Sequence, residues 1–277
     1  MSTNVSKRKL QESGDKKKKR AFVKHNGTTK MFSAKAKMTG FLITCTLNKE
    51  RSSAREMCEL LCEHVEKLYP ELCEEKKKDN NNIENGSENE EEEDIDDIDD
   101  IEASLAKELE DMKNNKKEEN KFEIVPLNIN CLGFIRAKIP IDPTKVVHSI
   151  FETIETKKEK KTRYTQRVIP IMNTCITNKP EIFRLAETII KPYFPDDQQK
   201  EYAIMIKIRN NSKMDRMEII KGVAGVIGEK HKVNLTNPQL FVIIEIFKTI
   251  CGISVVDDYF NYKKYNMEEV FEKANQQ

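Results

Sequence analysis

An acidic stretch divides this chain and limits what the rest of it can fold into. Residues 74–120 hold twenty Asp/Glu against seven Lys, including the run EEEEDIDDIDD at 90–100. A segment of this composition cannot bury enough apolar surface to offset the conformational entropy that ordering would cost. We therefore predict a disordered acidic insertion at 74–120 within one domain, whose core must be built jointly by the segments before and after it.

The first residues carry the opposite charge. Residues 1–38 hold twelve Lys/Arg against two acids, with the run KKKKR at 16–20. In the total net charge of +1, the excess of bases in residues 1–38 and the excess of acids in residues 74–120 largely cancel each other. The remaining residues hold 29 Lys/Arg and 25 Asp/Glu. We predict that 1–38 is a disordered basic tail that acts as a nucleic-acid arm or a nuclear address, with an unspecific solvated tail as the alternative.

Neither secretion nor a membrane location is expected. No segment has the uninterrupted apolar run that a signal peptide or a membrane-spanning helix needs. Seven cysteines without repeated short pairs are typical of reduced thiols rather than of a disulfide framework. Cys58, Cys62 and His64 are close enough to suggest zinc, but the two cysteines share the apolar face of a predicted helix, so we predict core packing and no metal site. The protein should be soluble and intracellular.

The hydrophobic pattern predicts the elements of a first domain. Short apolar runs rich in β-branched residues predict strands, and apolar residues at helical spacing predict helices. In chain order these are a strand at 41–47, a helix at 54–68, strands at 122–127 and 131–139, a helix at 142–154 and a strand at 167–176. Asp142 and Pro143 supply the N-cap and the first-turn proline of the second helix. The order β-α-β-β-α-β is the split pattern of a ferredoxin-like unit.

A second unit follows with the order α-β-α-β-β. Its elements are a helix at 182–193, an alternating strand at 202–208, a helix at 217–227, and nearly continuous apolar strands at 240–247 and 251–256. Lys207 and Arg209 share one face of the alternating strand. Residues 258–277 show no predicted element, and we expect a C-terminal tail there.

The sequence contains no arrangement of residues typical of catalysis. The glycine cluster at 222–228 lies inside a predicted helix, so close helix packing explains it better than a phosphate-binding loop does. The four histidines are scattered and do not form a nucleophile–base pair. Glu245 interrupts an apolar strand, and an ion pair with Lys207 or Arg209 is the simpler explanation. We therefore predict no catalytic residue, no cofactor and no small-molecule substrate.

The segment KTRYTQRVIPI at 161–171 is the densest candidate binding site, and its composition suits RNA. Lysine and arginine neutralise phosphates, and Tyr164 offers a stacking face. The apolar residues that follow can anchor the segment on a rigid sheet. A solvated cationic face without a ligand is the alternative interpretation.

Four segments carry a resemblance to a known family. They are RYTQRVIPI at 163–171, the strand at 202–210, GVIGEKHKVNLTNP at 225–238 and IIEIFKTICGISVV at 243–256. Together they closely resemble the family of THUMP-domain tRNA acetyltransferase adaptors over about residues 39–257. The resemblance implies an α+β or α/β fold with two domains. The first is an N-terminal ferredoxin-like domain at 39–176, interrupted by the acidic insertion. The second is a THUMP domain at 177–257, although in this family the start of the domain is also placed at about residue 147.

The same resemblance implies an adaptor rather than an enzyme. Members of the family bind tRNA and support acetylation of a cytidine in the D-arm of serine and leucine tRNAs, while a separate RNA cytidine acetyltransferase supplies the chemistry. We therefore expect a non-catalytic adaptor whose partners are tRNA and an RNA cytidine acetyltransferase. Together with the lysine run at 16–20, the resemblance implies a nuclear or nucleolar location, with the cytoplasm as a further site.

The residues that we expect to bind RNA are polar, basic or aromatic, and we expect contacts mainly to phosphate and 2′-hydroxyl groups. They are Lys161, Arg163, Tyr164, Gln166, Arg167, Arg184, Lys207, Arg209, Asn210, Lys230, His231 and Lys232. One alternative function is a protein-interaction module that docks basic partners through the acidic insertion, with incidental RNA binding. A transferase with an unrecognised site is another, although the sequence shows no loop for acetyl-CoA or a methyl donor.

Overall fold

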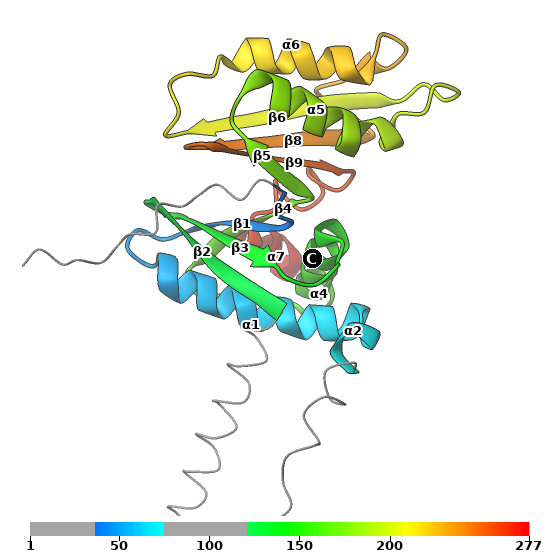
Figure 1. Cartoon of the computed structure of the whole chain (residues 1–277). Coiled ribbons are helices and arrows are strands. Elements are labelled where there is room, and N and C mark those ends of the chain that lie inside the picture. Colours follow the sequence, from blue (N-terminus) through cyan, green and yellow to red (C-terminus); the bar gives the residue numbers. More distant parts are fainter. Residues whose placement is uncertain (1–36, 75–120, 277) are drawn as a thin grey trace, which may run out of the picture. The chain divides into compact units, whose positions relative to one another are not determined.

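The computed structural model describes residues 37–74 and 121–276, which form a mixed α/β structure with a four-stranded and a five-stranded sheet (Figure 1). All of these residues belong to one compact unit, 34–277. The predictions for the basic tail and for nearly all of the acidic insertion fall outside the described residues. No described helix is long and apolar enough to cross a membrane.

The first sheet contains the strands that the sequence pattern predicts before residue 172. Its elements are β1 (Gly40–Cys45), α1 (Glu50–Leu68), α2 (Glu71–Glu74), β2 (Phe122–Ile129), β3 (Leu132–Ala137), α4 (Pro143–Lys157) and β4 (Thr165–Ile171). The strand order is β2-β3-β1-β4, and every neighbouring pair is antiparallel. The predicted element order β-α-β-β-α-β is confirmed, with the short helix α2 as an addition.

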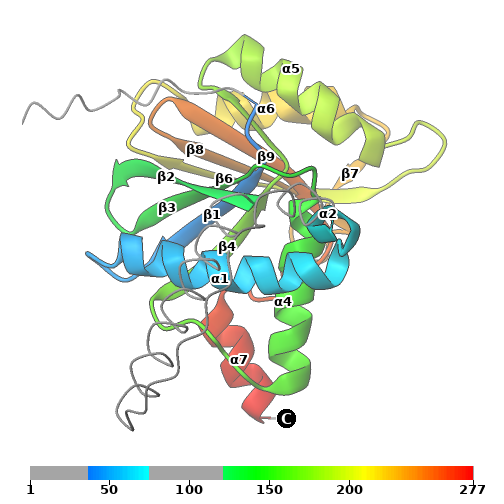
Figure 2. The same cartoon turned by 60° about the horizontal axis from the view of Figure 1, so that its bottom comes forward.

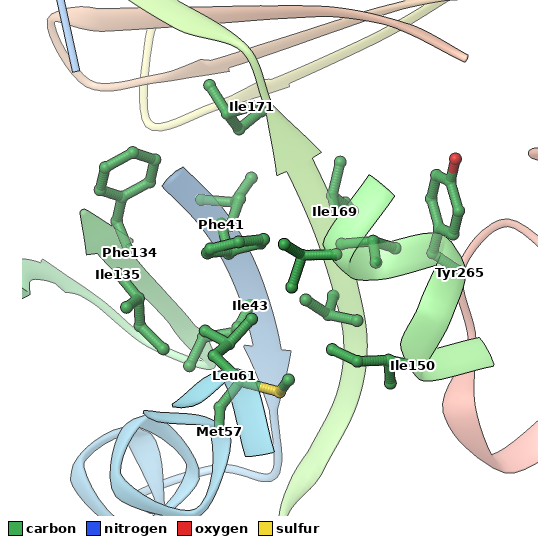
Figure 3. Close-up of a cluster of buried hydrophobic side chains, with 14 of the residues drawn as sticks. Phe41, Ile43, Met57, Leu61, Phe134, Ile135, Ile150, Ile169, Ile171 and Tyr265 are labelled. Atoms are coloured by element: carbon green, nitrogen blue, oxygen red, sulfur yellow. The ribbon is translucent and has the colours of Figure 1, made fainter. Parts of the chain in front are cut away.

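Helices α1 and α4 cover one face of this sheet because their apolar residues recur at helical spacing. Figure 3 shows Met57 and Leu61 of α1 and Ile150 of α4 gathered on the side of the strand residue Ile43, and all four are at most 1% exposed. Burial of side chains of this size contributes about 1.5–3 kcal/mol each.

The predicted start of α4 is confirmed. The carboxylate of Asp142 accepts a hydrogen bond from the backbone N–H of Thr144 (2.9 Å), and Pro143 occupies the first turn. The proline needs no donor there, because the first backbone N–H groups of a helix have no partner within it. The N-cap hydrogen bond satisfies one of the remaining donors, so this local signal is readable from sequence.

The second sheet has five strands in the order β5-β9-β8-β6-β7. Its elements are β5 (Asn173–Ile176), α5 (Lys179–Ile190), the 3₁₀ turn η2 (Lys191–Tyr193), β6 (Glu201–Arg209), α6 (Arg216–Ile227), β7 (Lys232–Val233), β8 (Leu240–Phe247) and β9 (Ile250–Val256). Strand β6 is parallel to β7 and β8, whereas β9 is antiparallel to β5 and β8. Helices α5 and α6 lie on one face of this sheet (Figure 1), and their apolar side chains share a core with Val242, Ile244 and Ile246.

The predicted single strand at 167–176 is wrong at Met172, where the chain passes from one sheet to the other. Strand β4 pairs with β1, and β5 pairs with β9. The backbone N–H of Met172 donates to Ser254 Oγ (3.0 Å) and to the carbonyl oxygen of Ile253 (3.1 Å). Both halves of the run are extended, so their partner strands distinguish them.

The two sheets also share a core. Along β8 the residues that alternate with the helix-covered ones, Phe241, Ile243 and Phe247, belong to the same buried cluster as β1, β3 and β4. The rings of Phe134 and Phe247 lie 6.1 Å apart between centroids. The Lys248 ammonium donates to the carbonyl oxygens of Leu127 and Asn128 at 2.7 and 2.8 Å.

Residues 258–277 are not the tail that the sequence predicts. The structure has an aromatic segment there, followed by α7 (Met267–Gln276), which lies beside α4 (Figure 2). Tyr259, Tyr262 and Tyr265 are at most 6% exposed and belong to the core of the first sheet. This segment therefore completes the N-terminal half of the fold.

Candidate nucleic-acid interface

A single carboxylate holds the chain that leads into β4. Glu56 of α1 accepts hydrogen bonds from the backbone N–H groups of Arg163 (2.9 Å), Tyr164 (2.9 Å) and Thr165 (2.7 Å). It also accepts one from the Thr165 hydroxyl at 2.8 Å. No local signal in the sequence marks Glu56 as this partner, because more than a hundred residues separate it from the segment that it holds. The side chains of Arg163 and Gln166 are exposed on this fixed segment.

Two cations flank the ring of Tyr164. Lys49 Nζ lies 5.3 Å from the ring centroid, and Arg163 Cζ lies 5.4 Å from it. Cations at this distance are attracted by the electron-rich ring face. Tyr164 is half-buried, so an aromatic surface and two positive charges occur together beside β4. Lys49 is an addition that sequence reasoning did not find.

Lys161 is already paired within the protein. Its ammonium lies 2.5 Å from Glu63, which also pairs with Lys67 at 2.6 Å. Hydrogen bonds from Lys161 and then Lys67 lower the pKa of the Glu63 carboxyl to about 2. The charge of Lys161 is therefore less available to phosphate than that of Arg163.

The guanidinium of Arg167 is also occupied, in this case by the C-terminal segment. Its Nη1 donates to the carbonyl oxygens of Lys263 (3.3 Å) and Lys264 (3.0 Å), and its Nη2 lies 3.5 Å from a carboxylate oxygen of Glu269. A side chain with three such partners is primarily a structural clamp. We therefore assign Arg167 the role of positioning the C-terminal segment rather than the predicted direct contact with RNA.

The predicted ion pair of Glu245 is confirmed for Arg209. Glu245 is only 2% exposed, lies opposite Lys207 in the β6–β8 register, and forms an ion pair with Arg209. Burial raises the pKa of the Glu245 carboxyl, and the two cations oppose that shift. Burial also lowers the pKa of the half-buried Lys207 ammonium, and Glu245 opposes this. Asn210, with φ of 52°, follows as an exposed turn residue.

The other predicted residues lie elsewhere. Lys232 pairs in register with Glu201 at the first residue of β6, and Lys230 precedes it. Since β6 runs from Glu201 to Arg209 and a strand rises about 3.3 Å per residue, these lysines lie roughly 20 Å from Lys207 and about 26 Å from Arg209. The structure therefore does not bring the twelve residues into one site.

Two of the twelve have local roles instead. Arg184 lies on α5 and pairs with Glu181 of the same helix. His231 is 6% exposed, its ring centroid lies 5.0 Å from that of Phe194, and its Nδ1 accepts a hydrogen bond from the Lys200 backbone N–H at 3.2 Å. The burial of His231 contradicts its proposed role as an RNA contact.

The residues considered for zinc pack in the core, as predicted. Cys58, Cys62 and His64 are 6%, 8% and 1% exposed, and His64 Nδ1 lies 2.9 Å from Ser149 Oγ. Burial lowers the pKa of His64 to about 4. In the described ranges 37–74 and 121–276, no cluster of three or more His, Cys, Asp or Glu could hold a metal ion.

A cavity of about 600 Å³ lies beside α4 and the end of β9. Its lining includes the carboxylates of Asp142, Glu152, Asp257 and Asp258. Carboxylates repel phosphate, so this cavity is unsuited to an RNA backbone. The cationic surface beside β4 and β6 is therefore the better candidate for a nucleic-acid interface.

Comparison with known proteins identifies a matching domain family and several sequence relatives of this chain. The model of the THUMP domain matches residues 177–256. THUMP domain-containing protein 1 of Mus musculus is 39% identical over 241 residues, which cover 86% of this chain and 65% of that protein. The Drosophila melanogaster homolog of that protein is 30% identical over 262 residues, covering 89% of this chain and 79% of the homolog. A Saccharomyces cerevisiae protein named tRNA acetyltransferase TAN1 is 29% identical over 247 residues, covering 84% of this chain and 85% of its own length. The chain thus spans slightly less than two thirds of the mouse relative.

Proposed function

The chain belongs to the family of THUMP domain-containing protein 1, and from this membership we propose that it binds tRNA as a non-catalytic adaptor for tRNA acetylation. The observation that carries the proposal is the match to a yeast protein named for tRNA acetylation, which extends over 84% of this chain. Both sheets, and not only the THUMP match at 177–256, are therefore included in the likeness.

The adaptor presents serine and leucine tRNAs to an RNA cytidine acetyltransferase, which forms acetylcytidine in the D-arm. Holding a tRNA in one orientation against an enzyme replaces a random encounter by a prearranged one, which can lower a barrier by several kcal/mol without any catalytic side chain. The lysine run at 16–20 supports a nuclear or nucleolar place of action, although it lies outside the described residues.

We also propose that residues 39–176 form a ferredoxin-like domain and 177–257 a THUMP domain. The strand order β2-β3-β1-β4, with α1 and α4 against one face, supports the first assignment. The pairing of β5 with β9 places the physical crossover between the sheets near Met172, slightly before the proposed boundary.

The tRNA contacts that we propose lie beside β4 and at the end of β6. Arg163, Gln166 and Lys207 contact backbone phosphates or 2′-hydroxyl groups, and Tyr164 stacks on an unpaired base. Three features support this choice: Arg163 and Gln166 are exposed, Glu56 holds their backbone, and two cations flank the tyrosine ring.

The test is tRNA binding by the purified full chain over a salt series, with serine tRNA and a plain RNA duplex as ligands. Each phosphate that a lysine or arginine neutralises should contribute roughly −0.7 to −0.9 to the log–log salt slope. Arg163→Glu should weaken tRNA binding about tenfold or more, because it replaces attraction by repulsion beside the phosphates. Lys221→Glu is the matched control, because Lys221 is exposed on α6 away from the proposed site. Equal losses in the two variants, or a slope near zero, would contradict the proposal.

Two further arms separate the alternatives. Isothermal titration with acetyl-CoA should show no saturable binding to the chain alone, because the partner enzyme carries the cofactor. Deleting residues 75–120 should leave tRNA binding intact. Loss of all binding on deletion would favour a protein-docking module that works through the acidic insertion.

A further inference from the structure

A left-handed turn outside the THUMP match stands out in the backbone. Lys263, Lys264 and Tyr265 have φ angles of 50°, 59° and 57°. Three consecutive residues of this kind are unusual without glycine, because the left-handed conformation costs about 1–2 kcal/mol per residue. Such strain persists only where the surrounding structure determines it.

Contacts on several sides hold this turn in place. Tyr265 is 1% exposed, and its hydroxyl donates to Asp258. The Lys264 backbone N–H donates to the Tyr259 carbonyl oxygen at 2.7 Å, and the Val168 N–H donates to the Tyr265 carbonyl oxygen at 3.3 Å. Arg167 donates to the carbonyl oxygens of both lysines. The turn is therefore a rigid part of the fold.

The turn buries its tyrosine and exposes both lysines. The side chains of Lys263 and Lys264 are exposed, and they form no hydrogen bond or ion pair with any residue that the structure describes. By contrast, Lys161, Arg184 and Arg209 each have a carboxylate partner. The two lysines thus present unneutralised charge from a fixed backbone.

This charge adjoins the cations at the end of β6. Tyr259 connects the turn to β8, since its ring centroid lies 5.6 Å from that of Tyr265 and 5.3 Å from that of Phe241. Phe241 lies on the same face of β8 as Glu245. Burial, Arg209, Arg167 and Lys264, in that order, lower the pKa of Lys207, which indicates that these cations sense one another. The turn therefore lies within electrostatic range of the β6 cations.

We propose that Lys263 and Lys264 form a phosphate-binding element that extends the tRNA surface of Lys207 beyond the THUMP domain. This inference rests on the proposed tRNA-binding function. In the part of the chain that the structure describes, five cations from three separate parts, Arg167, Lys207, Arg209, Lys263 and Lys264, have Glu245 and Glu269 as their carboxylate partners. Exposed lysines act as point charges, so they fit a backbone of closely spaced phosphates rather than base edges. The element adds affinity and orientation without reading sequence.

The experiment measures serine-tRNA affinity of the full chain across a salt series for wild type and K263Q/K264Q. Loss of two phosphate contacts should make the salt slope shallower by roughly 1.4 to 1.8 and weaken binding at 0.1 M salt about tenfold or more. K191Q/K221Q removes the same charge from two exposed lysines of η2 and α6 and should leave the slope unchanged. An unchanged near-ultraviolet circular dichroism spectrum will show that the tyrosines around the turn remain packed.

The outcomes separate this inference from the function on which it rests. A wild-type chain that binds tRNA with a steep slope, together with an equally steep slope in folded K263Q/K264Q, would overturn the inference and leave the proposed function standing. A wild-type chain without salt-dependent tRNA binding would overturn both. If K191Q/K221Q lost as much as K263Q/K264Q, the effect would be one of net charge, and the site would be rejected.

Discussion

At the scale of single residues, buried His64 connects the stability of this chain to pH. Its pKa of about 4 in the folded protein lies below the ordinary value of 6.5, chiefly because burial disfavours the charged ring. As pH falls below 6.5, the unfolded chain binds a proton at this position that the folded chain rejects. Stability from this group is therefore full above pH 6.5 and is lost as pH falls towards 4.

This gives a prediction for His64→Gln, which keeps a polar group near Ser149. Between pH 7 and pH 5 the free energy of unfolding of the wild type should fall by about 2 kcal/mol more than that of the variant. Urea unfolding at both pH values measures the difference. Parallel pH dependences in the two proteins would show that His64 is not the group responsible.

Residue-scale reasoning from sequence succeeded where the cause is local or where a charge needs a partner. The N-cap Asp142, the core positions of Cys58 and Cys62 and the Glu245–Arg209 pair were all predictable on these grounds. The clamps Glu56 and Arg167 were not found as clamps, because their partners lie about a hundred residues away in sequence. Cationic composition therefore predicts a binding surface, but it does not reveal which cations already have partners.

At the scale of elements, Arg167 tests whether the lysine turn is held from β4. Arg167→Gln should lower the free energy of unfolding by about 1–3 kcal/mol, because two carbonyl oxygens lose a charged donor. It should also weaken tRNA binding, since the lysines of the turn lose their fixed position. Arg167→Lys should restore part of both effects.

Combining Arg167→Gln with K263Q/K264Q decides how Arg167 acts. If the arginine works by positioning the turn, its loss should cost little further affinity once the two lysines are gone, because the turn then has no charge to position. Additive losses in tRNA affinity would instead assign Arg167 a direct phosphate contact, as the sequence suggests. Chemical denaturation and salt-series binding on the four proteins supply both readouts.

The elements themselves were largely predictable where one periodicity dominates. Helices α1, α4, α5 and α6 follow from apolar residues at helical spacing, and β8 and β9 from continuous apolar runs. The break at Met172 and the turn at 263–265 were not predictable, because partner strands and packing determine them rather than any local signal. No glycine marks either position.

At the scale of the whole molecule, substitution of a glycine tests how closely the two sheets approach each other. A Cβ on Gly252 of β9 would lie 2.9 Å from Cγ2 of Ile171 on β4, at the junction of the two sheets. Gly252→Ala should therefore lower the free energy of unfolding by about 1–3 kcal/mol. In an Ile171→Ala background the same change should cost much less, because the opposing atoms are gone.

Gly225 provides the matched control for this prediction. A Cβ there would meet no atom within 4 Å, and the residue lies inside α6. Gly225→Ala should therefore stabilise the protein by about 0.5–1 kcal/mol through helix propensity alone. Calorimetry or urea unfolding of the four variants compares the two positions. If Gly252→Ala lowered the free energy of unfolding equally in the wild type and in the Ile171→Ala background, a close approach of the sheets at this point would be refuted.

The aromatic segment and α7 also constrain the order of events during synthesis. Tyr259, Tyr262 and Tyr265 belong to the same buried cluster as β1, whose residues are translated more than two hundred codons earlier. On the ribosome the first sheet must therefore wait, with part of its apolar surface uncovered, until the residues of α7 have emerged. Domains that fold as they are made have no such delay. Nascent chains of this protein should accordingly depend on chaperones that shield apolar surface until translation of this segment is finished.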